Sequence, residues 1–143
     1  MNNIFSVITN KNLKDKMVIG FILSNKNEEV LLIKRKIDRI NKEIYDIPYV
    51  NTNKNNEKEI LKEVNSKYGI NLKNVLGYID ETVVLDDECN TVPQINMHSS
   101  IDENDINKQL DYKWEKIDNL INSDIITDSL KNSIEIYKYN KNL

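Results

Sequence analysis

The chain has few of the residues that form covalent cross-links and sharp turns: one cysteine, two prolines and three glycines. The single cysteine, Cys89, excludes an intrachain disulfide and any Cys-x-x-Cys metal or redox motif. No apolar run approaches the length of about 18 residues that a membrane-spanning helix needs, and the first residues lack the basic and apolar regions of a secretory signal. These absences favour a reducing, cytoplasmic setting.

An excess of positive charge is also missing. The sequence has 20 Lys and Arg against 23 Asp and Glu, a net charge of −3, and its basic residues form no sustained stripe. A broad nucleic-acid-binding surface is therefore disfavoured. With 143 residues, 39% of them hydrophobic and 30% charged, the composition is typical of one soluble globular domain. We expect residues 1–16 to be an N-terminal extension with a short strand from Ile4 to Thr9.

The clearest local pattern predicts an amphipathic helix over residues 57–68. Its apolar positions are Ile60, Leu61, Val64 and Tyr68, which fall on one side of a helix. Asn55 or Asn56 can cap its start, and Gly69 can adopt the left-handed conformation that ends a helix. The polar side of this helix carries Glu59, Lys62, Glu63, Ser66 and Lys67.

The remaining apolar segments predict strands on both sides of this helix. Residues 17–24 form a continuous apolar run, as in a strand covered on both faces. Further extended segments are predicted at 30–36, 43–50, 75–85, 92–100 and 111–117, with a loop at 102–110 and a turn at 118–121. Thr127 is the expected cap of a last helix that runs to Tyr139. This order of elements predicts a mixed sheet with helices packed on it.

Several segments in this order carry a family resemblance: Val30-Leu-Leu-Ile-Lys-Arg, Ile47-Pro48, Lys62-Glu-Val-x4-Gly-Ile and, later, the Trp-containing segment 112–120. In this order they resemble the Nudix hydrolases of the MutT type. The family signature is Gly-x5-Glu-x7-Arg-Glu-U-x-Glu-Glu-x-Gly-U, where U is aliphatic. The resemblance covers about residues 17–139 and implies a Nudix-type α/β/α sandwich with a mixed central sheet, in the α+β class.

The same resemblance locates a candidate site on the predicted helix. Aligned on Gly69 and Ile70, Glu63 keeps the first carboxylate of the signature, but the paired carboxylates that hold magnesium in the family fall on Ser66 and Lys67. The two glycines that follow Ile-Pro in the family fall on Tyr49 and Val50. Magnesium requires several hard oxygen ligands. One carboxylate beside an ammonium group does not supply them.

We therefore weigh two functions. In the first, the magnesium site is impaired and hydrolysis is weak or absent. Lys67 with Lys34 and Arg35 then forms a metal-free site for a nucleotide-like or other phosphorylated ligand, or the cleft that corresponds to the family's substrate site binds a protein partner. A plainer interpretation of Lys67 is a solvated ion pair with Glu63. In the second, the chain is a Mg- or Mn-dependent hydrolase of nucleoside-diphosphate-linked compounds. Its metal ligands are then Glu63 with Glu59, which lies four residues earlier on the same helix face, or with the acidic residues 86–88.

Four other features are candidates for a role. His98 has a side-chain pKa suited to a general base, although a structural role is the simpler interpretation. Cys89 has no neighbouring base to activate it. Trp114 is expected either to pack in the core or to stack on the nucleobase of a ligand. The predicted strand from Ile4 to Thr9 offers an edge for a homodimer.

Overall fold

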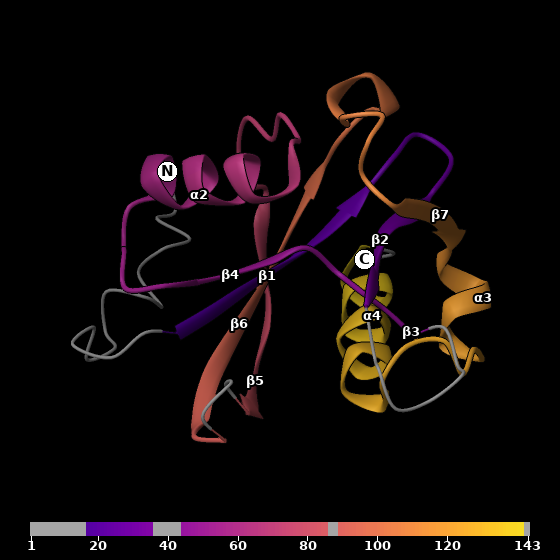
Figure 1. Cartoon of the computed structure of the whole chain (residues 1–143). Helices are drawn as coiled ribbons and strands as arrows, with labels where there is room; N and C mark the ends of the chain where they lie inside the picture. The colour runs from indigo at the N-terminus through magenta and orange to yellow at the C-terminus, as the bar shows by residue number, and fades with distance from the viewer. Residues whose placement is uncertain (1–16, 36–43, 86–88, 142–143) are drawn as a thin grey trace.

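The fold is a mixed seven-stranded sheet with helices packed against it (Figure 1). The structure is a computed structural model that describes residues 17–35, 44–85 and 89–141. Its strands are β1 (Met17–Ser24), β2 (Glu29–Arg35), β3 (Ile44–Asp46), β4 (Tyr49–Thr52), β5 (Gly77–Leu85), β6 (Thr91–Ser100) and β7 (Tyr112–Lys116). Its helices are α2 (Glu57–Tyr68), α3 (Ile117–Ile121) and α4 (Asp128–Lys141), with a 3-10 turn, η1 (Glu103–Asp105).

Strand β1 is the centre of the sheet. It pairs in parallel with β6 on one edge, and on the other edge its first half pairs antiparallel with β4 while Ser24 pairs with Val30 of β2. Strand β2 also pairs with β3 and β7, and β6 pairs with β5. All eight residues of β1 are buried, which confirms the predicted strand covered on both faces.

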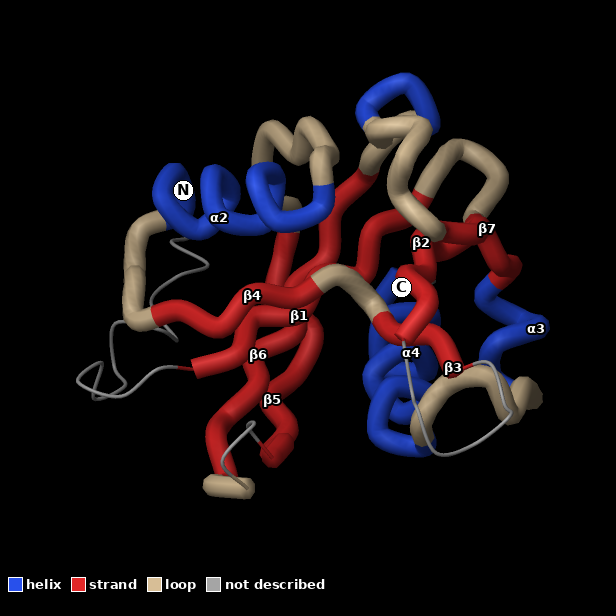
Figure 2. The backbone as a smooth tube through the Cα atoms, in the orientation of Figure 1, coloured by secondary structure: helices blue, strands red, loops and turns tan. Residues whose placement is uncertain are grey.

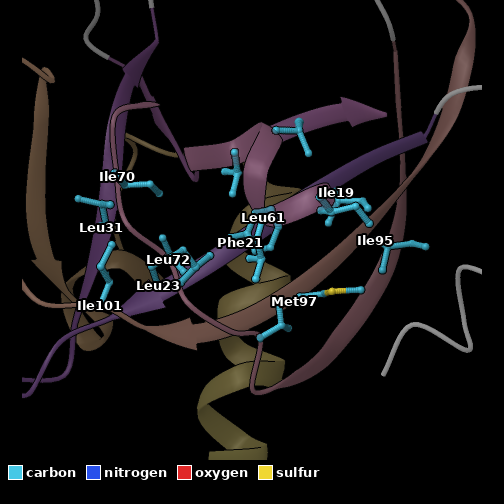
Figure 3. Packing of buried hydrophobic residues seen from close by; sticks show 14 of the residues in the cluster. Ile19, Phe21, Leu23, Leu31, Leu61, Ile70, Leu72, Ile95, Met97 and Ile101 are labelled. Carbon is cyan, nitrogen blue, oxygen red and sulfur yellow. The ribbon is translucent and has the colours of Figure 1, made fainter. Parts of the chain in front are cut away.

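Successive residues of β1 point to two separate hydrophobic cores. Ile19, Phe21 and Leu23 pack with the buried residues of α2 (Figure 3), whereas Ile22 packs with α3 and α4. Because side chains alternate along a strand, these two cores lie on opposite faces of the sheet. In Figure 1, α2 lies above β4, β1 and β6, and α4 lies away from it on the side of β3 and α3. The predicted sandwich and mixed sheet are confirmed.

Helix α2 has the predicted bounds because its ends are specified locally. The Asn56 side chain accepts a hydrogen bond of 3.2 Å from the backbone N–H of Glu59, and Gly69 has a φ of 66° with its N–H bonded to the Asn65 carbonyl. Ile60 and Val64 are fully buried. Each should contribute about 1.5–3 kcal/mol of hydrophobic stabilisation. The polar side of α2 is thereby held at a fixed rotation relative to the sheet.

Three predicted elements need correction. The extended segment 43–50 is two strands, β3 and β4, separated at Ile47 and Pro48 (Figure 2). Proline has no N–H for a strand ladder, and the Pro48 carbonyl instead accepts a hydrogen bond from the N–H of Phe21. The predicted turn 118–121 is the short helix α3, and the strand predicted from residue 75 begins at Gly77.

The end of the chain agrees with its predicted cap. Oγ1 of Thr127 accepts a 3.2 Å hydrogen bond from the N–H of Leu130, and α4 continues two residues beyond Tyr139. The predicted strand from Ile4 to Thr9 lies outside the described residues. In the part of the chain that is described, no helix combines the length and apolar character needed to cross a bilayer.

Candidate functional site

Lys67, in the last turn of α2, is held against strand β4. Its Nζ donates a hydrogen bond of 3.0 Å to the carbonyl oxygen of Tyr49 and lies 3.8 Å from the centroid of the Tyr49 ring. The Tyr68 ring lies 5.1 Å from the same nitrogen, and the Tyr68 hydroxyl is 3.0 Å from both the N and the O of Tyr49. Ring faces attract cations, so the ammonium has a defined position.

This ammonium group borders a cavity of about 500 Å³, a volume within the usual range for small-molecule sites. Arg35 at the end of β2 lines the same cavity, as does Asp46 at the end of β3. Burial raises the pKa of the Asp46 carboxyl, and this effect is opposed by a 2.8 Å hydrogen bond from the Ile47 N–H and by the positive charges of Arg35 and Lys67. One side of the cavity thus carries two cations and one carboxyl group.

The floor of the cavity carries a chain of polar side chains on the sheet face that α4 covers. Asn96 of β6 is 2% exposed. Its Nδ2 donates to Oδ1 of Asp80 at 2.9 Å and to Oγ of Ser133 at 3.2 Å, and its Oδ1 accepts from Nε2 of Gln94 at 2.8 Å. The Ser133 hydroxyl donates to the other Asp80 oxygen at 2.9 Å. Gln94, Asn96 and Ser133 all line the cavity.

Solved structures with the same arrangement of strands and helices are Nudix proteins. The MutT protein from Methanosarcina mazei Go1 superposes with a TM-score of 0.69 at 16% identity, over 88% of this chain and 95% of that one. A NUDIX hydrolase from Nitrosomonas europaea gives 0.62 at 14% identity, over 89% and 90%. The C. elegans Ap4A hydrolase gives 0.63 at 11% identity, over 89% and 98%. The chain has the Nudix fold.

The agreement is one of fold and does not extend to overall sequence. Comparison of the sequence with models of known protein families and with curated proteins gives no match. The functional residues of this Nudix-fold chain therefore have to be argued from its own geometry.

The two predicted metal ligands on α2, Glu63 and Glu59, do not line the cavity. Oε1 of Glu63 accepts a 3.2 Å hydrogen bond from the Thr52 hydroxyl, and Glu59 is exposed in the first turn of α2. Within residues 17–35, 44–85 and 89–141, no group of three or more His, Cys, Asp or Glu side chains is arranged to hold a metal ion. Magnesium prefers near-octahedral oxygen coordination. The described residues do not supply such a set of ligands for magnesium.

The structure brings some of the predicted site residues together and separates others. Lys67 and Arg35 border one cavity, whereas Lys34, the neighbour of Arg35, does not line it. Successive strand residues point to opposite faces, which explains this division. The acidic residues 86–88 lie outside the described part of the chain.

The other candidates lie away from this cavity. His98 is half-buried, with its ring 5.2 Å from that of Tyr137, and burial together with the Lys141 charge lowers its pKa. Cys89 is exposed. Trp114 packs against the core that contains α2.

Asp46, Gln94, Asn96 and Ser133 line the cavity but were not among the candidate site residues chosen from the sequence. Their proximity depends on strand register: Tyr49 pairs with Gly20, and Gly20 pairs with Asn96. The one signal in the sequence was Gly20 itself, which interrupts an otherwise large-residue apolar strand. An added Cβ there would lie 2.6 Å from Oδ1 of Asn96 and 3.0 Å from Nε2 of Gln94.

Proposed function

We propose that this chain binds a nucleotide-like or other phosphorylated ligand in the cavity beside Lys67 and Arg35, without a divalent cation and with weak or no hydrolysis. The observation that supports this proposal is the placement of charge: two cationic side chains border one cavity, and the carboxylates of α2 do not. A phosphate group needs opposite charge and hydrogen-bond donors, and both of these side chains supply them.

The fixed position of Lys67 strengthens the proposal. An exposed lysine loses conformational freedom when it binds a ligand, and this loss weakens binding. The ammonium of Lys67 already contacts the carbonyl and the ring of Tyr49, so part of this ordering is present in the free protein. A preorganised cation of this kind binds an anion more tightly than a mobile one.

The proposal of weak or absent hydrolysis rests on the ligand set. Cleavage of a phosphoanhydride in Nudix enzymes requires a divalent ion to neutralise the phosphates and orient the attacking water. The Lys67 ammonium repels such an ion from the end of α2. The alternative, a Mg- or Mn-dependent hydrolase that uses Glu63, requires the ion to bind despite this repulsion.

Calorimetric titration with ADP in the presence of EDTA tests the proposal. We expect ADP to bind the wild-type chain, Lys67→Ala to lose at least about tenfold in affinity, since charge-assisted hydrogen bonds contribute about 1.5–3 kcal/mol, and no phosphate to be released when magnesium is added. Lys62→Ala is the matched control because Lys62 is an exposed lysine on the same helix. The proposal is wrong if ADP binds only with magnesium, or if Lys67→Ala and Lys62→Ala bind it alike.

A further inference from the structure

The hydrogen bonds that link the polar side chains on the cavity floor run in one defined order from donor to acceptor. This order is set by the carboxylate of Asp80, whose two oxygens accept hydrogen bonds from Nδ2 of Asn96 and from the hydroxyl of Ser133. An ionised carboxylate only accepts hydrogen bonds. The atom of Asn96 that faces Asp80 must therefore be its amide nitrogen, and the amide carbonyl of Asn96 must face away from it.

The orientation of the Asn96 amide in turn fixes the orientation of the Gln94 amide. Oδ1 of Asn96 lies 2.8 Å from the amide of Gln94, and because an amide carbonyl only accepts, the Gln94 atom that faces it must be Nε2. Oε1 of Gln94 then points away from Asn96. Among the residues that the structure describes, Oε1 accepts no hydrogen bond, and Gln94 lines the cavity. Gln94 thus presents an oriented acceptor, beside the remaining N–H of its amide, to whatever occupies the cavity.

Gly20 provides the space for this arrangement. A Cβ on Gly20 would approach both amides, at 2.6 Å from Asn96 and 3.0 Å from Gln94. Glycine in a strand interior weakens the strand and often marks a close approach of another group. Here the two amides occupy the volume that a side chain at position 20 would fill. The strand, the helix residue Ser133 and the two amides together make a built site.

We infer that Gln94 is a specificity-determining residue that recognises an amide-like edge, an N–H donor beside an acceptor, on the uncharged part of the ligand. This inference rests on the proposed function, because the phosphate must be held by Lys67 and Arg35 for the rest of the ligand to reach Gln94. Asp80 and Asn96 are positioning residues that act through Gln94. A glutamine side chain pairs with such an edge through two hydrogen bonds.

The sheet sets the size of the ligand. Tyr49, Gly20 and Asn96 are direct partners on three neighbouring strands. Strands in a sheet lie about 4.8 Å apart, so the backbones of Tyr49 and Asn96, on either side of β1, are separated by about 10 Å. The ligand class is therefore a phosphorylated compound long enough to reach across β1, from its phosphate beside Lys67 and Tyr49 to its donor–acceptor edge beside the amides of β6.

Binding of matched nucleotides in EDTA tests the inference. Inosine, adenosine and uridine monophosphates each carry a donor beside an acceptor on the base, whereas purine riboside monophosphate lacks the donor. We expect at least one of the first three to bind the wild type about tenfold or more tightly than purine riboside monophosphate, since a bidentate pair typically discriminates by such a factor. In Gln94→Met, this ratio should fall to about one.

Two further variants separate specificity from structural damage. Asp80→Asn replaces one of the two acceptor oxygens that orient Asn96 and Ser133 with an N–H donor, so it should reduce the same ratio while leaving the circular dichroism spectrum of the fold in place. Gln109→Met changes an exposed glutamine outside the cavity and should keep the wild-type ratio.

The possible failures are distinguishable. If the monophosphates bind in a Lys67-dependent way but the wild type does not discriminate, or discrimination survives in Gln94→Met, the inference is overturned and the proposed function stands. If neither the monophosphates nor inorganic phosphate binds, the proposed function fails and the inference fails with it.

Discussion

Replacing Gly20 by alanine tests the packing on which the polar floor of the cavity depends. The new Cβ would lie 2.6 Å from Oδ1 of Asn96, 2.9 Å from Cδ1 of Ile47 and 3.0 Å from Nε2 of Gln94. Asn96 is 2% exposed and held by Asp80 and Ser133, so it has no room to turn away. The clash must be relieved by moving the strand or by breaking the hydrogen bond between Gln94 and Asn96.

The size of the effect follows from these two routes. Overpacking a core site costs about 1–3 kcal/mol, and a buried carbonyl left without a donor costs about 1–3 kcal/mol. Alanine recovers about 0.5–1 kcal/mol that glycine loses in a strand interior. Because either route alone relieves the clash, we expect Gly20→Ala to lower the free energy of unfolding by about 1–2 kcal/mol net of this recovery.

Urea denaturation measures this loss as a lower midpoint at an unchanged slope. Gly77→Ala is the matched control: its Cβ would lie 2.5 Å from Nε2 of His98, but this atom belongs to the ring of a half-buried side chain, which is less enclosed than Asn96. We expect this control to lose less than about 1 kcal/mol. Wild-type stability in Gly20→Ala, or a larger loss in Gly77→Ala, would refute the packing argument.

Three further predictions concern charge. The double variant Ser66→Glu, Lys67→Glu should gain magnesium binding, seen as a magnesium-dependent rise in Tm that the wild type lacks. Asp46→Asn removes the carboxyl group beside the two cations and should tighten ADP binding in calorimetry; equal or weaker binding would contradict this account. Burial and Lys141 lower the pKa of His98, so the unfolded chain binds the proton more readily. The free energy of unfolding should then fall as pH drops below about 6.5, and His98→Gln should flatten this part of the urea profile.

The sequence predicted those parts of the fold whose causes are local. Helix α2 was predicted to the residue because Asn56, Gly69 and the apolar spacing act within a few positions of one another. The break at Pro48 was missed because it depends on which neighbour each half pairs with: β3 pairs with β2, and β4 pairs with β1. A run of extended residues does not contain this information.

The cavity was less predictable for the same reason. Lys67 and Arg35 were chosen by sequence, but the neighbours that define the cavity come from strands far apart in the chain. Gln94 and Asn96 were predicted only as part of the extended segment 92–100. Their role in the cavity depends on strand register with Gly20 and on the contact with Ser133 of α4, and both of these are tertiary contacts that the local sequence does not specify.

Two of the residues that depart from the signature in the proposed resemblance, Tyr49 and Lys67, are in contact with each other, and this contact supports interpreting them together. Tyr49 stands where the family has a glycine, and Lys67 stands where it has a carboxylate; the Lys67 ammonium lies 3.8 Å from the Tyr49 ring centroid and 3.0 Å from its carbonyl oxygen. A carboxylate at position 67 would face an electron-rich ring and a carbonyl, both of which repel it. A glycine at position 49 would remove the ring that holds the ammonium in place. Each residue is thus favourable in the presence of the other, which supports the proposal of a fixed monovalent cation at this end of the helix.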